Sequence, residues 1–390
     1  MATGDESTTP LLPQNNGSTG ERRRNSNVRS SWRSGSRSSF ASPRLRRSST
    51  RDVHPRHDEV EPVLPATAVP AEQETRLHNT NWALSDEEPN TWAQIRHNWR
   101  EEFAYVDLAP YDIKYSSTAE FFGTFMILIF GPAVEAQVAL HNRPASSSHD
   151  FTYGDYLQCR FTWAVGVAMA VWVAGGVSGG HCNPTITIVL ALFRGFPARK
   201  VPSFIISQVL GAMLATFLVY ANYTHSISLY EGGDDVRTVV GPHATASLFF
   251  TLPAAGLPYI SAFYTEFLAS AILVMIVFAV SDKANLAPPR GTMPFALFLA
   301  LLGIGSALGV NTGYAINGAR DTGPRIALSL IGYGKDVWLH DRLYWLWAPW
   351  GASICGGTVG GFVYDAFLYT GRDSPLNRPR SGGKTNDDYI

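Results

Sequence analysis

The sequence is poor in cysteine and in charged side chains. It holds three cysteines among 390 residues, Cys159, Cys182 and Cys355. An odd number without metal-ligand spacing argues against a disulfide framework or a zinc site, so no metal or other cofactor is expected. Charged residues make up 16% of the chain and the net charge is −1, which argues against nucleic acid as a partner. The sequence also lacks an arrangement of nucleophile and base, so an enzyme is not expected.

Long apolar runs are absent from residues 1–115, which are rich in Ser, Arg, Pro and Glu. No signal-peptide pattern opens the chain, and these residues are expected to form a disordered cytoplasmic tail. Its segment 22–56 holds eleven Arg against one acidic residue, interleaved with serines. Two interpretations stay open. The segment binds anionic lipid and is released by phosphorylation at Ser26 or Ser49, or it is a solvated tail whose kinase-like sites arise by chance.

Residues 116–370 are, in contrast, mostly apolar and are expected to form one integral-membrane domain. Six stretches are long enough to cross a bilayer: 117–139, 157–177, 201–222, 259–280, 293–310 and 343–368. Lys and Arg follow the second, fourth and sixth spans, whereas the loop at 223–258 is acidic. Both termini, including a short tail at 371–390, are therefore expected in the cytoplasm. The sequon at Asn222 would then face outward as a candidate glycosylation site.

Two short polar motifs interrupt the apolar region, Asn183-Pro184-Thr185 and Asn317-Gly318-Ala319. Each lies at the end of one apolar segment and opens a short amphipathic one. Asn is a favoured helix N-cap, and Pro184 fits the first helical turn, where its missing N–H costs nothing. The motifs predict two re-entrant half-helices whose positive N-terminal ends meet in mid-bilayer. Because irregular backbone at that depth must pack in protein or line a wet cavity, the pattern indicates a pore.

The two halves of this region repeat each other. Residues 119–124 in the first span, which include Glu120, are similar to residues 265–270 in the fourth, which include Glu266. Each half, 116–222 and 259–370, contains three spans and one Asn motif, so the second half must insert upside down. The predicted fold class is all-α and membrane-integral, with six transmembrane helices and two half-helices in an inverted repeat. Glu120 and Glu266 are expected to accept hydrogen bonds from the re-entrant loops rather than to carry protons.

These motifs resemble the signatures of the aquaporin (major intrinsic protein) family, and more narrowly of its glycerol-conducting branch, the aquaglyceroporins. The resemblance covers about residues 116–370 and includes Asp321 directly after Arg320. Both motifs depart from the family's Asn-Pro-Ala, since Thr185 replaces Ala and Gly318 replaces Pro. The second change is expected to loosen the start of its half-helix. The long N-terminal tail resembles those of fungal aquaglyceroporins and points to a fungal source.

The resemblance implies a narrowest ring of four residues, which fall on Trp163, Gly305, Tyr314 and Arg320. Trp163 and Tyr314 would form an apolar corner for the C–H edge of a polyol, opposite the donors of Arg320, while Gly305 leaves room. Below the ring, the amide NH₂ groups of the two motif asparagines would point into the lumen, and the carbonyls of 179–182 and 314–316 would accept hydrogen bonds from a permeant.

Two neighbours of the first motif keep alternative readings. His181 is either a pore group or a packed loop histidine. Cys182 is a small space-filling residue, unless it faces the lumen, in which case mercurials should block flux and Cys182→Ser should remove the block.

The implied function is a passive channel for water and glycerol that excludes ions and protons, with hydrogen peroxide as a further candidate permeant. The resemblance also implies homotetramers, and the plasma membrane is the expected location. Three alternatives stay open: a channel for water and hydrogen peroxide with little glycerol flux, an ion-coupled secondary transporter, and a non-conducting scaffold.

Overall fold

The computed structural model describes residues 110–142, 153–289, 291–371 and 374–377, all within one compact unit, Trp82–Ile390. The expected disordered tail, with Ser26 and Ser49, lies outside the described residues. Every regular element of the described part is helical. The structure therefore has the all-α fold class that the sequence predicts.

The first repeat contains three long helices and a half-helix. These are α3 (Pro110–His141), α4 (Tyr156–Ser178), the half-helix α5 (Pro184–Phe193) and α6 (Val201–Glu231). The second repeat contains α7 (Tyr259–Ser281), α8 (Met293–Leu308), the half-helix α9 (Gly318–Ile331), and a π-helical turn η3 (Leu346–Ala352) that continues as α11 (Ser353–Phe367). Short connecting elements are η1 (Ala198–Lys200), η2 (Ala246–Leu248) and α10 (Asp336–Leu339).

Four helices are long and apolar enough to cross a membrane, at residues 113–141, 156–178, 198–231 and 259–281. The predicted fifth and sixth spans correspond to α8, which has 16 residues, and to η3 with α11. The main difference from the sequence prediction is at the third span, which continues well past the predicted end at residue 222. No Gly or Pro occurs between that residue and Gly232, whose φ of 91° caps α6. Asn222 therefore lies exposed within a helix rather than at the end of one.

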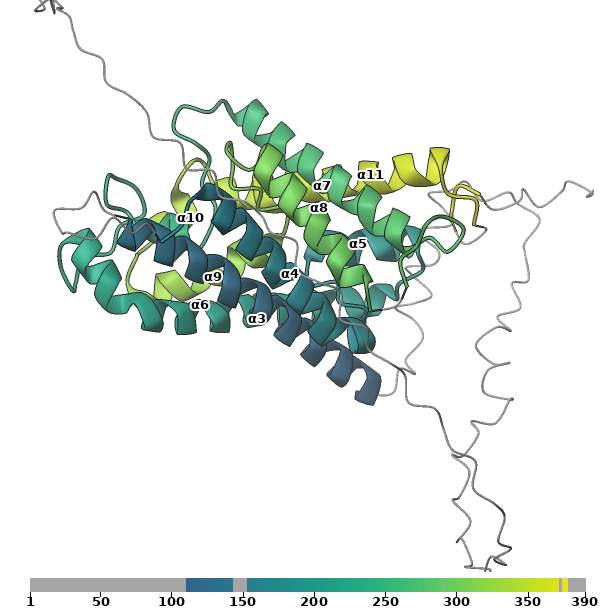
Figure 1. The fold of residues 1–390 in the computed structure, drawn as a ribbon, viewed down its shortest axis with the longest axis horizontal. Helices are drawn as coiled ribbons and strands as arrows, with labels where there is room; N and C mark the ends of the chain where they lie inside the picture. Colours follow the sequence, from purple (N-terminus) through teal and green to yellow (C-terminus); the bar gives the residue numbers. More distant parts are fainter. Residues whose placement is uncertain (1–109, 143–152, 290, 372–373, 378–390) are drawn as a thin grey trace, which may run out of the picture. The chain divides into compact units, whose positions relative to one another are not determined.

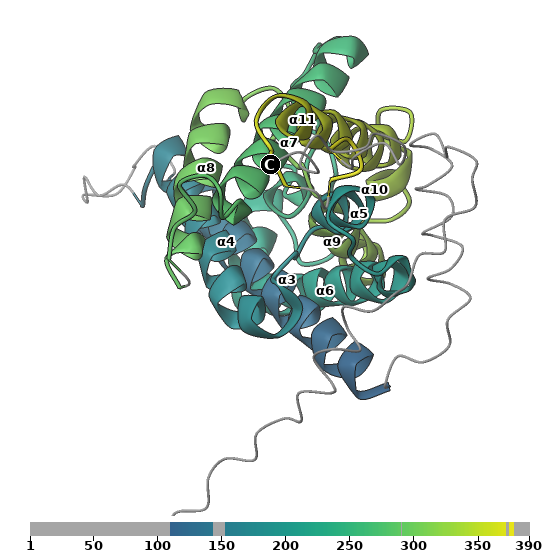
Figure 2. The same ribbon diagram turned by 90° about the vertical axis from the view of Figure 1, so that its right-hand side faces the viewer.

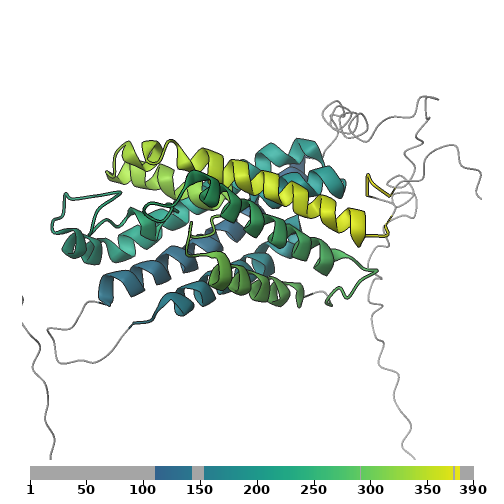
Figure 3. The same cartoon turned by 90° about the horizontal axis from the view of Figure 1, so that it is seen from above.

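The inverted repeat is visible in how the helices pack. In the first repeat α3 packs against α4 and α6, and in the second α7 packs against α8 and α11. Each half-helix also crosses to the other repeat, since α9 packs on α6 and α5 on α11. Figure 1 labels these helices, and Figure 3 shows from above that the long ones run alongside one another. In the turned view of Figure 2, α5 and α9 lie between helices of both repeats.

Two matched glycines allow the closest helix contacts. A Cβ at Gly211 of α6 would lie 2.1 Å from the carbonyl oxygen of Phe121 on α3. In the second repeat, a Cβ at Gly356 of α11 would lie 2.0 Å from the carbonyl oxygen of Phe267 on α7. Both distances are far below contact distance, so only glycine fits. Small residues that let backbones approach are the usual basis of helix packing in membranes, where apolar burial gives little driving force.

Candidate functional site

The two half-helices begin at the asparagines that the sequence singled out. Asn183 has an extended backbone (φ −159°, ψ 123°), and its Oδ1 accepts from the N–H of Thr185 at 2.8 Å. Asn317 is also extended (φ −154°, ψ 106°), and its Oδ1 accepts from the N–H of Ala319 and of Arg320, both at 3.0 Å. Pro184 occupies the first turn of α5. The capping geometry is therefore the one expected of an N-cap asparagine.

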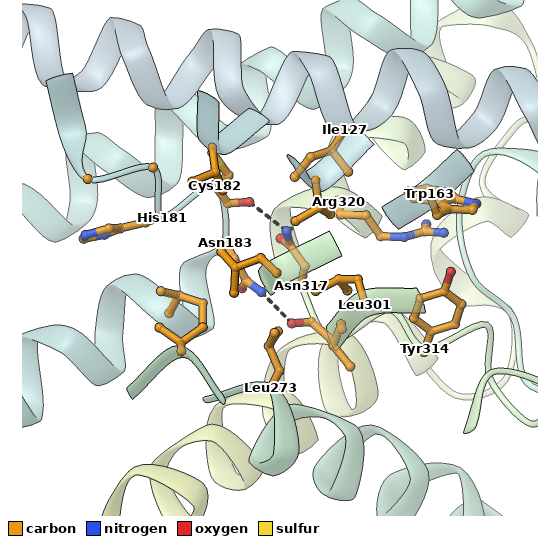
Figure 4. A pocket seen from close by; sticks show the side chains of 18 of the residues that line it. Ile127, Trp163, His181, Cys182, Asn183, Leu273, Leu301, Tyr314, Asn317 and Arg320 are labelled. Atoms are coloured by element: carbon orange, nitrogen blue, oxygen red, sulfur yellow. Dashed lines mark hydrogen bonds between the residues drawn. The ribbon is translucent and has the colours of Figure 1, made fainter. Parts of the chain in front are cut away.

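The amide nitrogens of the two asparagines join the opposed loops. Nδ2 of Asn183 donates to the carbonyl of Ile316, and Nδ2 of Asn317 donates to the carbonyl of Cys182, each at 2.8 Å. Figure 4 shows these two bonds side by side at the centre of the cavity. The sequence-based expectation assigned both N–H groups of each amide to the lumen. Since an amide NH₂ carries two donors, one holds the opposite loop and the second is left for the cavity that both side chains line.

A buried carboxylate holds the first re-entrant loop in place. Glu120 is fully buried and accepts from the N–H of His181 (2.9 Å) and of Cys182 (2.6 Å). It also accepts from the side chains of Ser178 (2.5 Å) and Gln208 (2.7 Å). All four donors point at one carboxylate, which satisfies a charge that would otherwise be costly to bury.

The second loop is held by the repeat partner of this carboxylate. Glu266, also fully buried, accepts from the N–H of Ala315 at 2.9 Å and of Ile316 at 2.7 Å. Both loops are strained, since Cys182, Tyr314 and Ile316 have φ values of 49°, 40° and 42°, in the left-handed region that non-glycine residues rarely adopt. Such conformations persist only where the surroundings impose them. The carboxylate–backbone bonds supply that constraint for both loops, whose residues 179–183 and 313–317 line the cavity.

Three residues of the predicted ring, Trp163, Tyr314 and Arg320, line one end of the cavity, and the fourth, Gly305, lies against the Tyr314 ring. The guanidinium carbon of Arg320 is 4.3 Å from the centroid of the Trp163 ring. A Cβ at Gly305 would lie 2.7 Å from Cζ of Tyr314, so the phenol ring occupies the space that a side chain at residue 305 would need. The Tyr314 hydroxyl is buried and has no hydrogen-bond partner among the described residues. Figure 4 shows the Trp163, Arg320 and Tyr314 side chains gathered on the same side of the cavity.

The loop before α7 fixes the position of Arg320, which is 9% exposed. Its guanidinium donates to the carbonyl of Phe249 at 3.2 Å. Asp321 does not line the cavity but accepts from the N–H and hydroxyl of Thr251, at 2.8 and 2.7 Å, and from Nε of Arg325 at 2.6 Å. Asp321 thus anchors the segment that carries the carbonyl bonded to Arg320.

Both departures from the family's motif are matched by a neighbouring residue. Gly318 faces Trp350, and a Cβ at residue 318 would lie 2.4 Å from the indole ring. The indole Nε1 donates to Thr322 at 2.9 Å, which ties the π-helical turn to α9. In the other repeat, the methyl group of Thr185 fills space left by Gly357, where a Cβ would lie 2.6 Å from it. The expected loosening at Gly318 is therefore offset by the packing of Trp350.

The two residues before Asn183 differ in how they meet the cavity. His181 lines it and also packs in the loop, with Nδ1 3.2 Å from the Thr187 hydroxyl and its ring 4.7 Å from that of Phe196. Cys182 contributes its carbonyl, but its Sγ lies beside α3, 2.4 Å from where a Cβ on Gly123 would be. Both readings of His181 are thus compatible with its position, and the Cys182 thiol fills space against α3.

The cavity that these residues line encloses about 260 Å³. One wall carries the polar groups of residues 179–183 and 313–317, with Arg320 at its end. The rest of its lining is mainly apolar and includes Ile127, Leu273 and Leu301, all of which Figure 4 labels. Within the described part of the chain, no group of three His, Cys, Asp or Glu side chains lies close enough to hold a metal ion.

Several residues of the site were missed at the sequence level. Phe249 contacts it from the loop before α7 and Trp350 from the π-helical turn η3, and the sequence pattern places neither residue at the site. Two others, Glu135 of α3 and Arg160 of α4, form an ion pair next to Trp163. The signal for this pair is present in the sequence, since each is a charged residue inside a predicted span, where a functional role is the default expectation.

Comparisons with known proteins agree with this geometry. The family model described as "Major intrinsic protein" matches residues 109–364. An aquaporin of Laccaria bicolor is 50% identical over 260 residues, which cover 66% of this chain and 76% of that protein. A probable aquaglyceroporin of Gibberella zeae is 44% identical over 296 residues, covering 76% of this chain and 80% of that protein.

Among solved structures, the aquaglyceroporin from Plasmodium falciparum is similar, with a TM-score of 0.57 and 28% identity. The match covers 66% of this chain and 97% of that one. The half-helices capped by Asn183 and Asn317, the inverted repeat and these matches lead to one conclusion. The chain belongs to the major intrinsic protein family and is a non-enzymatic, multi-pass membrane channel of the aquaporin and aquaglyceroporin type.

Proposed function

We propose that this channel passes water and small neutral polyols, glycerol above all, and excludes ions and protons. The observation that carries the proposal is the composition of the narrow ring. The Arg320 guanidinium stacks 4.3 Å from the Trp163 ring, and Tyr314 lies where Gly305 has no side chain. The ring thus combines the charged donors of Arg320 with the aromatic side chains of Trp163 and Tyr314.

A polyol fits such a ring because its two edges differ. Its hydroxyl oxygens accept from the Arg320 guanidinium. One N–H of this group donates to the Phe249 carbonyl, and its other N–H groups are available to the permeant. Its C–H edge packs on the aromatic corner of Trp163 and Tyr314. Further in, the carbonyls of the strained loops and the second N–H groups of Asn183 and Asn317 replace the hydrogen bonds that the molecule loses with water.

Two sources of positive charge oppose the passage of ions and protons. The N-termini of α5 and α9 converge at the two asparagines, and each helix end carries roughly half a positive charge. Arg320 adds a full charge at the ring, where it is 9% exposed. These positive charges repel cations. Anions lose their hydration among the apolar side chains that line the rest of the cavity, and no cation beyond the ring compensates for that loss. A neutral solute is exempt from both costs.

Other functions are less well supported by the site. A channel for water and hydrogen peroxide with little glycerol flux is favoured by one observation, the Tyr314 ring filling the space beside Gly305. An ion-coupled transporter needs a carboxylate that can bind its ion, but Glu120 and Glu266 are already bonded to loop N–H groups. A non-conducting scaffold does not need the compensating packing at Gly318.

Stopped-flow light scattering of proteoliposomes tests the proposal. Wild-type vesicles should swell in glycerol gradients faster than protein-free ones. Gly305→His should lower glycerol permeability more than water permeability, because the imidazole and Tyr314 compete for the same space. The double variant Gly305→His/Tyr314→Ala restores that space and should recover part of the glycerol flux. Wild-type vesicles that pass water but no glycerol would exclude the proposal in favour of the narrower channel.

The remaining assignments are proposals of the same kind. We place the channel in the plasma membrane as a homotetramer, with the tails at 1–115 and 371–390 in the cytoplasm and residue 222 on the outer side. The basic residues that follow α5 and α7 support this orientation. The sequon is a poor glycosylation site, because Asn222 is held in a helix. Ser26 and Ser49 remain candidate phosphorylation sites.

A further inference from the structure

Beside the narrow ring lies an ion pair that the channel motifs do not include. Glu135 is on α3 and Arg160 is on α4, and one guanidinium nitrogen of Arg160 donates to Oε1 of Glu135. The side chains are 24% and 7% exposed. Both charges lie inside helices that cross the membrane, where an ion pair is expensive to maintain and a functional reading is the default.

The pair contacts Trp163 through its carboxylate. The indole Nε1 donates to the same Oε1 of Glu135 at 3.0 Å. One turn earlier on α3, Gly131 lies under the indole, where a Cβ would be 2.4 Å from the ring. Residues 131 and 135 of α3 thus both contact the Trp163 indole. Together they fix the plane of the indole and the direction of its N–H. The free face of the indole stacks on Arg320.

The pair contacts the opposite half of the ring through its guanidinium. The Arg160 guanidinium carbon lies 5.2 Å from the centroid of Tyr314 and 4.6 Å from that of Tyr156. The Tyr156 hydroxyl donates to the carbonyl of Gly305 at 2.9 Å. The ion pair and Tyr156 therefore contact three members of the ring, namely Trp163, Tyr314 and Gly305. They act on the fourth member, Arg320, through Trp163.

The charges also matter for Arg320. Within the described part of the chain, this residue hydrogen-bonds a carbonyl and stacks on Trp163 but has no carboxylate partner. Glu135 accepts from the N–H of the same indole on which Arg320 stacks, so its negative charge lies near Arg320. As long as Arg160 pairs with Glu135, the carboxylate is neutralised. Without Arg160, Arg320 becomes the available guanidinium, and pairing with Glu135 would draw it away from the lumen.

We propose that Glu135 and Arg160 are positioning residues of the selectivity ring: they orient Trp163 and Tyr314, and Arg160 keeps Arg320 free for the permeant by neutralising Glu135. The inference rests on the proposed function, because it assigns a role in choosing between glycerol and water. The proposed positioning role can be distinguished from a purely structural role by one measurement. A structural pair should lose stability when broken but leave the ratio of the two permeabilities unchanged.

Three variants separate the charge from the hydrogen bond. Glu135→Gln keeps an oxygen that can accept from the Trp163 indole and removes the negative charge. Arg160→Gln leaves the Glu135 carboxylate unpaired. This carboxylate should then pair with Arg320, and the glycerol-to-water permeability ratio should fall by about tenfold. The double variant Glu135→Gln/Arg160→Gln has no unpaired charge and retains the acceptor, and its ratio should return to within about threefold of wild type.

A matched control exists at the other end of the channel. Arg194 also pairs with a carboxylate, Asp365 at 2.6 Å, and stacks on two aromatic rings, Phe278 (3.9 Å) and Tyr369 (4.1 Å). Arg194→Gln breaks an equivalent pair without touching the ring. It should lower the melting temperature as Arg160→Gln does and leave the permeability ratio unchanged.

The measurement is stopped-flow permeability of proteoliposomes to water and glycerol, normalised to folded protein, together with thermal unfolding in detergent. A wild-type ratio in Arg160→Gln would overturn the inference, as would a double variant impaired as much as Arg160→Gln. If wild-type vesicles pass water alone, the proposed function fails. The same series then tests the inference through water permeability, where Arg160→Gln must differ from both the double variant and Arg194→Gln.

Discussion

The second motif contains a glycine where a proline is usual in the family, and the structure connects this change to Trp350. Gly318→Ala tests the connection. The added Cβ would lie 2.4 Å from two atoms of the indole ring, far inside contact distance. The ring cannot withdraw freely because its Nε1 donates to Thr322 at 2.9 Å and its backbone belongs to the π-helical turn η3. Overpacking of this kind costs about 1–3 kcal/mol.

We therefore expect Gly318→Ala to lower the stability of the folded channel by about 2 kcal/mol, or the melting temperature by about 4–8 °C for a domain of this size. Alanine is a better helix former than glycine, so any destabilisation comes from the clash and not from propensity. Thermal unfolding of the detergent-purified protein measures this. Water permeability measured on the same sample reports whether α9 keeps its place.

A double-mutant cycle with Trp350→Leu makes the test specific. Leucine removes both the ring and its bond to Thr322, so this single variant is destabilised by itself. In the double variant the methyl group added at position 318 meets no ring, and the coupling between the two sites should be at least about 1 kcal/mol. Additive effects, or a Gly318→Ala protein as stable as wild type, would refute the account of this motif as a matched pair.

Three further outcomes follow from contacts at the site and in the packing. Glu266→Ala leaves the buried N–H groups of two loop residues without an acceptor, at about 1–3 kcal/mol each, so thermal unfolding should begin well below wild type and water flux per folded protein should fall. Mercuric chloride should inhibit water flux less than about twofold, because Cys182 is 3% exposed and its thiol packs on α3. The assay is made in a Cys355→Ser background, which removes the exposed cysteine, and a strong block there would contradict this placement. Gly211→Ala drives a Cβ to 2.1 Å from a backbone oxygen of α3, so α3 and α6 must separate, at about 3 kcal/mol; unchanged unfolding of this variant in detergent would show that the two helices are not in such close contact.

Much of the architecture could be predicted from the sequence because its determinants are local. Asn183 and Pro184 define a helix start by their own chemistry, and the repeated acidic residue at positions 120 and 266 marks the two halves. The predicted third span ended too early, although the sequence contains a signal for the true end of α6. The first helix-breaking residues after residue 222 are Gly232 and Gly233, and α6 ends there.

The parts that could not be predicted depend on residues that meet only in the fold. Each motif asparagine donates to a carbonyl more than 130 residues away in the other repeat, so its partner follows from the meeting of two loops. The packing of Trp350 on Gly318 likewise requires the π-helical turn. The family resemblance implied that Trp163 and Arg320 belong to one ring, but only the three-dimensional contacts reveal Glu135 bonded to the Trp163 indole.

The central claim is that the lumen between the two half-helices admits neutral hydrogen-bonding molecules and rejects charge. The most direct test measures glycerol flux and proton flux in the same proteoliposomes, by light scattering and by an entrapped pH-sensitive dye. The account predicts glycerol-driven swelling well above protein-free vesicles, with proton flux at the protein-free level under an imposed pH gradient. Proton flux that rises with the amount of channel, or glycerol uptake that depends on an ion gradient, would contradict it.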